Sequence, residues 1–249
     1  MLNLIGNIAA MATILIDAAA IFSAVALTTR QRLTAAGAAG AWVGLASALG
    51  ANGALAFSPN QPIPVLGVLF ATPLATAAIL WRVSPGFRGA LMAIPTDLLV
   101  GLNALRLLGG LFLGLAAVGR LSGPFPYSAA LGDIATASLA IPLALRIRRG
   151  DWSYAARWNA LGALDLVLAV GLGLTSAQGA PFQIFHGGAG SMAMQSLPFS
   201  LVPTVLVPFY LLIHGLIGAQ LLARKRTRQD ASTRDAIQDW ISPRLSGLN

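Results

Sequence analysis

Eight polar side chains inside otherwise apolar stretches are the residues of this sequence best suited to chemistry. A charged group in the hydrocarbon of a membrane costs at least about 2.5 kcal/mol, so it usually faces the interior of a helical bundle. There it either locks helices together or binds and moves a proton or a small solute. The eight candidates are Asp17, Asn103, Arg106, Asp133, Asn159, Asp165, Tyr210 and His214.

Depth along the apolar stretches predicts a first pair between Arg106 and Asp133. At about 1.5 Å of rise per residue, Arg106 lies about 22 Å from the arginine-rich end of its stretch, and Asp133 lies about 12 Å from the opposite end of the next stretch. Both therefore fall in the same middle-to-outer layer. Asn103 precedes Arg106 by three residues and shares its face of the helix. The pair would serve either as a lock between two helices or as part of a proton or solute path.

A second, separate pair is expected between Asp165 and His214. Both lie about 12–15 Å from the arginine-rich ends of their stretches by the same arithmetic. Asp17 fits either layer. The expected partner of Asp165, His214, has an imidazole that can change its protonation state near neutral pH. If either Asp133 or Asp165 carries function, we therefore expect it to be Asp165. The alternative is that this pair also only holds helices together.

The last apolar stretch carries a polar stripe that could line a cavity. Pro203, Val207, Tyr210 and His214 are spaced i, i+4, i+7 and i+11, which places them on one face of a helix. Pro203 and Pro208 each remove a backbone donor and bend the helix. The plainer interpretation is that prolines are common in membrane helices anyway.

Composition requires that membrane helices position these residues. The chain is 56% hydrophobic and 10% charged, whereas a soluble domain is typically about 25% charged. We expect an all-α polytopic bundle of about seven spans, each long enough to cross a bilayer. The expected spans are residues 4–28, 33–57, 64–81, 91–118, 125–145, 158–175 and 197–223.

The arginines predict which way the bundle faces. They gather in the links after the first, third and fifth spans and in the tail that begins at Arg224, whereas Arg120 stands alone on the other side. Because basic residues in short links stay in the cytoplasm, we expect the N-terminus outside and the C-terminus inside. The chain then divides into a membrane bundle, residues 1–223, and a basic cytoplasmic tail, residues 224–249. The chain is rich in Ala, Gly and Arg, an amino-acid composition that indicates a GC-rich bacterial genome. We therefore expect the protein in the bacterial inner membrane.

Several classes of function are excluded or left without support. The absence of cysteine excludes thiol catalysis, Fe–S clusters and disulfides. No P-loop, GxSxG or HExxH motif is present, and no lysine lies in a span to form a retinal Schiff base. His186 has no second metal-ligating residue nearby, so no metal site is expected, and no cofactor is indicated. The net charge is +8, and the basic residues lie at the ends of the spans and in the tail. These positions indicate contact with lipid headgroups rather than binding of nucleic acid.

Four stretches resemble a family of uncharacterised seven-helix bacterial membrane proteins. They are Asn103-Ala-Leu-Arg106-Leu-Leu-Gly109-Gly110-Leu-Phe-Leu, Gly132-Asp133-Ile, Trp158-Asn159-Ala-Leu-Gly162-Ala-Leu-Asp165-Leu, and Val202-Pro203-Thr-Val-Leu-Val-Pro208 followed by His214. The resemblance covers the chain from the fourth span onward. It implies a membrane bundle and no particular activity.

Three functions remain open. The first is the binding or movement of a small solute or proton in a cavity lined by the fourth to seventh spans. The second is a non-catalytic accessory subunit of a larger membrane complex, with protein partners and purely structural polar pairs. The third is a lipid-modifying enzyme in which Asp165 and His214 act as acid and base, so enzymatic activity is undecided. Membrane lipids are expected partners of all three.

Overall fold

The computed structural model describes residues 1–58 and 64–246, with side chains described as far as Asp235. The described part is all-helical, and seven of its helical segments are long and apolar enough to cross a membrane, which confirms the predicted class. The elements are α1 Leu2–Ala24, α2 Thr29–Ala51, α3 Val65–Val83, α4 Pro85–Met92, α5 Thr96–Leu102, η1 Asn103–Gly110, α6 Leu111–Ala117, α7 Phe125–Arg148, α8 Ala155–Thr175, η2 Met192–Gln195, η3 Val202–Leu206 and α9 Val207–Ser246.

The fourth span differs from the prediction at its start. Residues 85–92 form the separate short helix α4, and the span itself begins only at Thr96. The break falls at Pro95, because proline lacks a backbone donor and disfavours a helical conformation in the residue before it. This shift of five residues matters for the site described below.

The fourth span also changes its helical type midway. Residues Asn103–Gly110 form a 3₁₀ helix between two α-helical segments. A 3₁₀ helix has three residues per turn, so residues three apart lie directly above one another. Asn103, Arg106 and Gly109 are accordingly the buried residues of this segment. Long 3₁₀ runs inside a helix are uncommon and mark hinges or strained sites.

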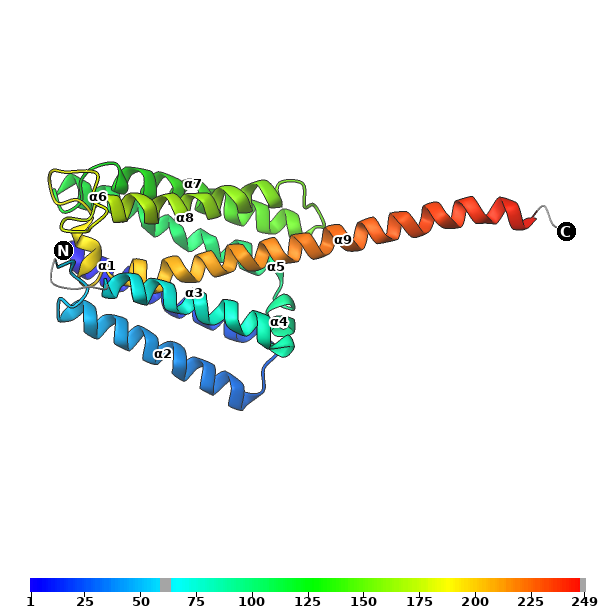
Figure 1. The fold of residues 1–249 in the computed structure, drawn as a ribbon, viewed down its shortest axis with the longest axis horizontal. Coiled ribbons are helices and arrows are strands. Elements are labelled where there is room, and N and C mark those ends of the chain that lie inside the picture. Colours follow the sequence, from blue (N-terminus) through cyan, green and yellow to red (C-terminus); the bar gives the residue numbers. More distant parts are fainter. Residues whose placement is uncertain (59–63, 247–249) are drawn as a thin grey trace.

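The helices pack around α9 and α7 (Figure 1). Helix α7 packs against η1, α8 and α5, and α9 packs against α8, α3 and α5. Helix α2 lies at the far edge and buries only Ala46 and Gly50. Helix α9 continues without a break past the bundle, so residues 224–246 extend the last span away from the other helices.

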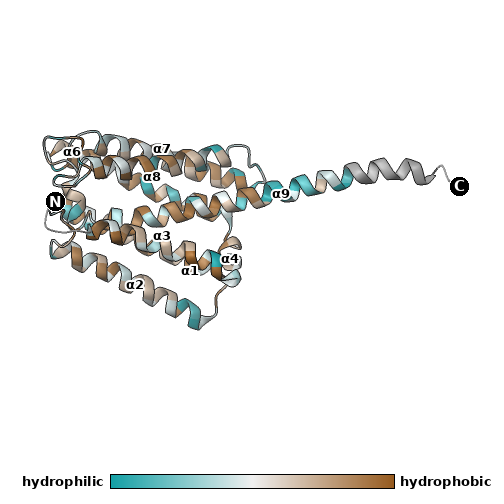
Figure 2. Ribbon diagram, viewed as in Figure 1, coloured by the Kyte–Doolittle hydropathy of each residue, from teal (hydrophilic) through white to brown (hydrophobic). Residues whose placement is uncertain are grey.

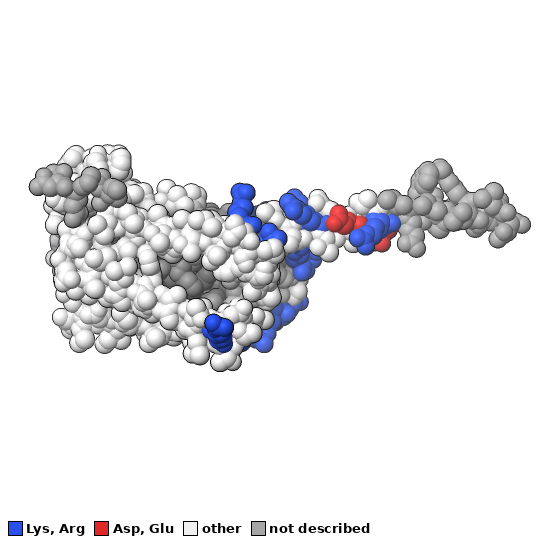
Figure 3. Space-filling model, turned by 60° about the horizontal axis from the view of Figure 1, so that its bottom comes forward, with Lys and Arg blue, Asp and Glu red and all other residues white. Residues whose placement is uncertain are grey.

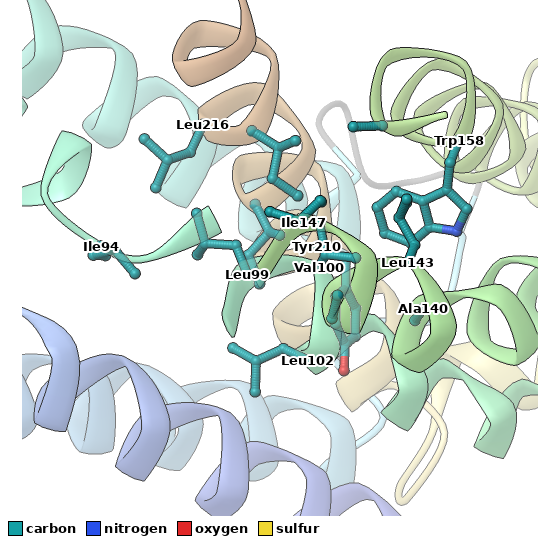
Figure 4. Close-up of a cluster of buried hydrophobic side chains, with 14 of the residues drawn as sticks. Ile94, Leu99, Val100, Leu102, Ala140, Leu143, Ile147, Trp158, Tyr210 and Leu216 are labelled. Atoms are coloured by element: carbon teal, nitrogen blue, oxygen red, sulfur yellow. The ribbon is translucent and has the colours of Figure 1, made fainter. Parts of the chain in front are cut away.

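The two largest of the four apolar clusters among the described residues lie one toward each end of the bundle. The larger includes Leu99, Val100, Leu143 and Trp158, which converge from α5, α7 and α8 (Figure 4). The other includes Phe112 and lies toward the end that carries residues 176–196. The polar site lies between the two clusters.

The outer surface of the bundle is apolar, as a lipid-facing surface should be. Large side chains such as Leu4, Leu15, Leu131 and Leu161 are exposed, and hydrophobic residues cover the length of the helices (Figure 2). Lysine and arginine gather at the end from which α9 projects (Figure 3). We call this the basic end, and we call the end that carries residues 176–196 the loop end.

The start of the seventh span is a π-helix, and the two prolines explain it. Val207 donates its N–H to the carbonyl of Val202, five residues back, as in a π-helix. Pro208 has no N–H to donate to the carbonyl of Thr204. The indole Nε1 of Trp42 donates to that carbonyl instead, at 3.1 Å. This contact ties the peripheral helix α2 to the bent part of the last span.

Candidate functional site

The side chain of Arg106 is the centre of the site. Its Nε donates to Oδ1 of Asp133 at 2.8 Å, and its Nη2 donates to Oδ2 of Asp165 at 2.5 Å. Nη1 donates to the carbonyl of Gly162 at 3.3 Å and contacts Nε2 of His214 at 3.1 Å. One guanidinium therefore joins α7, α8 and α9 to the 3₁₀ segment of the fourth span. Its side chain is only 2% exposed.

The predicted pair of Arg106 and Asp133 is confirmed, but the predicted second pair is wrong. Asp165 binds the same guanidinium as Asp133, and His214 contacts Arg106 rather than Asp165. The depth estimate failed because the fourth span begins at Thr96. Arg106 therefore lies ten residues from the start of its span, as Asp165 lies ten residues from the start of α8 at Ala155. What was expected to be two layers is a single cluster.

His214 is held by both ring nitrogens. An arginine can only donate hydrogen bonds, so Nε2 of His214 accepts from Nη1 of Arg106. Nδ1 then carries the proton and donates to Oδ1 of Asn159 at 2.9 Å. Nδ2 of Asn159 donates back to the backbone carbonyl of His214 at 3.1 Å. The two side chains that a lipid-modifying mechanism would use as acid and base, Asp165 and His214, both contact Arg106.

Three glycines make room for the side chains of the cluster. Each stands on one helix where a side chain from the next helix crosses it. The pairs are Gly109 with Asp133, Gly132 with Asp165, and Gly162 with His214. A β-carbon at Gly162 would lie 2.5 Å from Cε1 of His214, and one at Gly132 would fall on the carboxylate of Asp165. The cluster therefore depends on glycine at each crossing.

Tyr210 links the cluster to the first span. Its hydroxyl donates to Oδ2 of Asp17 at 3.0 Å, and its ring centroid lies 5.9 Å from Cζ of Arg106. Asp17 is 2% exposed, and its Oδ1 has no hydrogen-bond partner among the described residues. Asn103 stays apart from the cluster, because its Nδ2 donates to the carbonyl of Leu99 one turn earlier.

Acidic side chains outnumber basic ones in the described middle part of the bundle. Within the described mid-span residues, Arg106 is the one cation, and it faces the carboxylates of Asp133 and Asp165, with Asp17 nearby. A buried ion pair is tolerated only when its charges are balanced and hydrogen-bonded. The cluster therefore has one carboxylate beyond what the guanidinium balances, before Asp17 is counted.

Two cavities reach the cluster from the loop end and from the first span. The larger of these two cavities, which we call the main cavity, holds about 160 Å³ and is lined by Phe70, Phe112, Phe125 and Leu166, with Asp133 among them. Its lining continues to Ser191 and Gln195 in the loop-end segment, so it extends from that end toward Asp133. An apolar cavity of roughly 150 Å³ accommodates a ligand the size of benzene.

The second cavity is smaller and lies on the other side of Asp133. It holds about 70 Å³ and is lined by Thr13, Arg106, Asp133 and Tyr210 among others. The π-helical segment Val202–Leu206 contributes to the walls of both cavities. The side chains of Asp133 and Asp165 are 17% and 13% exposed, so the carboxylates are accessible where the guanidinium is not.

Sequence reasoning identified the polar residues of the site and missed the glycines. The signal was present, because Gly132 directly precedes Asp133, and Gly162 and Asp165 lie three residues apart. In membrane bundles small residues mark places where another helix comes close. With 27 glycines in the chain, no single one stands out without the helix positions.

The comparisons with known proteins support a family without a known activity. Residues 63–222 match the family model described as a domain of unknown function, DUF8737. No curated protein and no solved structure matches the chain. The matched range contains Arg106, Asp133, Asp165 and His214, and it leaves out α1 with Asp17 and α2.

Proposed function

This chain belongs to the DUF8737 family, whose function is unknown, and we propose that it moves protons through a bacterial inner membrane by way of Asp133 and Asp165. A small solute would occupy the main cavity beside Asp133. The basic end faces the cytoplasm, as expected for short arginine-rich links, so the loop end and the cavity open toward the outside.

The observation that supports this proposal is the unequal count of charges around Arg106. Two carboxylates share one guanidinium, and both have some exposure, whereas the guanidinium has almost none. An uncompensated charge in hydrocarbon is costly, so the second carboxylate would bind a proton and release it when the cavity presents water or a partner. In this role Arg106 holds both carboxylates in place, and His214 and Asn159 fix the orientation of Arg106.

Release to the basic end requires a change of shape. The apolar cluster with Leu99, Val100, Leu143 and Trp158 separates the site from that end. The 3₁₀ segment Asn103–Gly110 and the π-helix Val202–Leu206 flank the cluster on two spans. Both are irregular helical types found at hinges and functional sites, so these segments are the places where the two spans would bend.

Proton flux into liposomes tests the proposal. We expect the protein, reconstituted with a pH-sensitive dye inside the vesicles and an imposed gradient, to acidify them faster than protein-free vesicles do. Asp133→Asn and Asp165→Asn are each expected to reduce the rate to that of protein-free vesicles. Each single variant leaves one carboxylate against Arg106, so the cluster stays balanced and the fold is retained.

Asp151→Asn is the matched control, because it removes an aspartate outside the spans. Hydrogen bonds from Ser153 and Arg146 hold the pKa of Asp151 at about 2, so it stays ionised during the assay. Its variant should keep the full flux. Wild-type flux equal to that of protein-free vesicles, or full flux in both cluster variants, would refute proton movement. The latter result would leave the cluster as a structural lock, as in an accessory subunit.

A further inference from the structure

A groove lies at the basic end, between the C-terminal part of α3, the short helix α4 and residues 219–226 of α9. The groove is open, holds about 410 Å³ and is lined by Trp81, Arg88, Met92, Leu222 and Arg226 among others. Helix α4 sets the position of Arg88. The hydroxyl of Ser84 accepts from the N–H of Phe87 at 3.2 Å and caps the helix, and the N–H of Arg88 donates to the carbonyl of Ser84.

The groove continues into an apolar pocket that reaches into the bundle surface. This pocket holds about 440 Å³ and shares Trp81 and Ala219 with the groove. Its other walls come from side chains such as Leu74 and Ala77 of α3 and Phe209 of α9. Since roughly 150 Å³ already accommodates benzene, the pocket has room for a considerable length of hydrocarbon chain.

The charges at the mouth of the groove are unbalanced. Neither Arg88 nor Arg226 makes an ion pair with another described residue. The salt bridges among the described residues are made by Arg106 and Arg146. The lining of the groove and of the pocket contains no acidic residue. Figure 3 shows the basic side chains gathered at this end of an otherwise uncharged surface.

We propose that this groove and pocket bind one anionic phospholipid. The phosphate lies between Arg88 and Arg226, Trp81 lies at the level of the headgroup, and one acyl chain follows the pocket between α3 and α9. Tryptophan at the interface and paired basic residues beside a hydrophobic slot are the chemistry that recognises such a lipid. This site is separate from the Arg106 cluster and does not depend on the proton movement proposed above.

Lipid retention by the purified full chain tests the site. In native mass spectrometry of protein mixed with phosphatidylglycerol or phosphatidylcholine, we expect phosphatidylglycerol to be retained preferentially. Arg88→Gln with Arg226→Gln should weaken its binding about twenty- to thirtyfold, since each basic residue contributes about 1 kcal/mol near an anionic lipid and 1.4 kcal/mol is tenfold. Arg148→Gln with Arg228→Gln removes the same charge outside the groove and should leave binding unchanged.

The acyl-chain part of the proposal has its own variants. Ala77→Phe fills the pocket and should weaken phosphatidylglycerol binding while both arginines remain. Ala75→Phe adds the same side chain to an exposed position of α3 outside the pocket and should not. The assignment would be overturned if the two double arginine variants lost phosphatidylglycerol binding equally, or if phosphatidylcholine were retained as well as phosphatidylglycerol. It would also be overturned if Ala77→Phe had no effect on binding, or if inorganic phosphate alone displaced the lipid.

Discussion

Replacing Arg106 with leucine should lower the free energy of unfolding by about 3–5 kcal/mol, the cost of removing one partner from a buried ion pair. The guanidinium supplies donors to Asp133, Asp165, the carbonyl of Gly162 and His214. Without it, two carboxylates face each other with no cation between them. Reversible unfolding in mixed detergent micelles measures the loss.

A triple variant separates charge from packing. Arg106→Leu combined with Asp133→Asn and Asp165→Asn removes the guanidinium together with both carboxylates that it binds, and replacing a buried ionic group by neutral residues is often nearly neutral for stability. We expect the triple variant to regain most of the stability lost by Arg106→Leu alone. A triple variant no more stable than the single one would mean that the arginine acts through its shape rather than its charge.

Gly132→Ala should destabilise the protein by about 1–3 kcal/mol and disturb the cluster, because overpacking a close helix crossing forces side chains to move. The added β-carbon falls on the carboxylate of Asp165, which is held against Arg106 on the far side. Asp165 must therefore leave the guanidinium or α7 must move away from α8. Unfolding in detergent and the proton flux assay should both show the change.

Gly171→Ala is the control for this substitution. A β-carbon at Gly171 of α8 meets nothing within 4 Å, and alanine favours a helix over glycine by roughly 0.5–1 kcal/mol. We expect Gly171→Ala to be neutral or slightly stabilising. If Gly132→Ala unfolds no more easily than Gly171→Ala, the close crossing of α7 and Asp165 is not a tight contact.

Much of the fold and part of the site follow from the sequence. Apolar length and the few charges predict seven spans and their order, because a helix of about 20 apolar residues crosses a bilayer and satisfies its own backbone hydrogen bonds. The pair of Arg106 and Asp133 was predicted correctly although the depth of Arg106 was overestimated, and the stripe from Pro203 to His214 indeed faces the cavities and the cluster. These predictions need only helix geometry and the cost of burying polar groups.

The composition of the whole cluster could not be predicted in the same way. One proline, Pro95, moves the start of the fourth span by about one and a half turns, and this shift is comparable to the difference in depth between the two expected layers. A 3₁₀ segment then changes which residues share a face. Whether Asp165 contacts Arg106 or His214 depends on how each helix is rotated about its own axis. This rotation cannot be predicted from the positions of polar residues in the sequence.

Infrared spectroscopy of the cluster tests most directly whether it carries an exchangeable proton. All eight acidic side chains are aspartates and none is glutamate, so carboxyl bands can be assigned with few variants. We expect wild-type protein to show the C=O band of a protonated carboxylic acid that changes with pH, remains in Asp17→Asn and is absent from both Asp133→Asn and Asp165→Asn, since the remaining carboxylate stays ionised against Arg106. Wild-type spectra in which both aspartates remain ionised at every pH where the protein is folded would contradict the proposed proton movement.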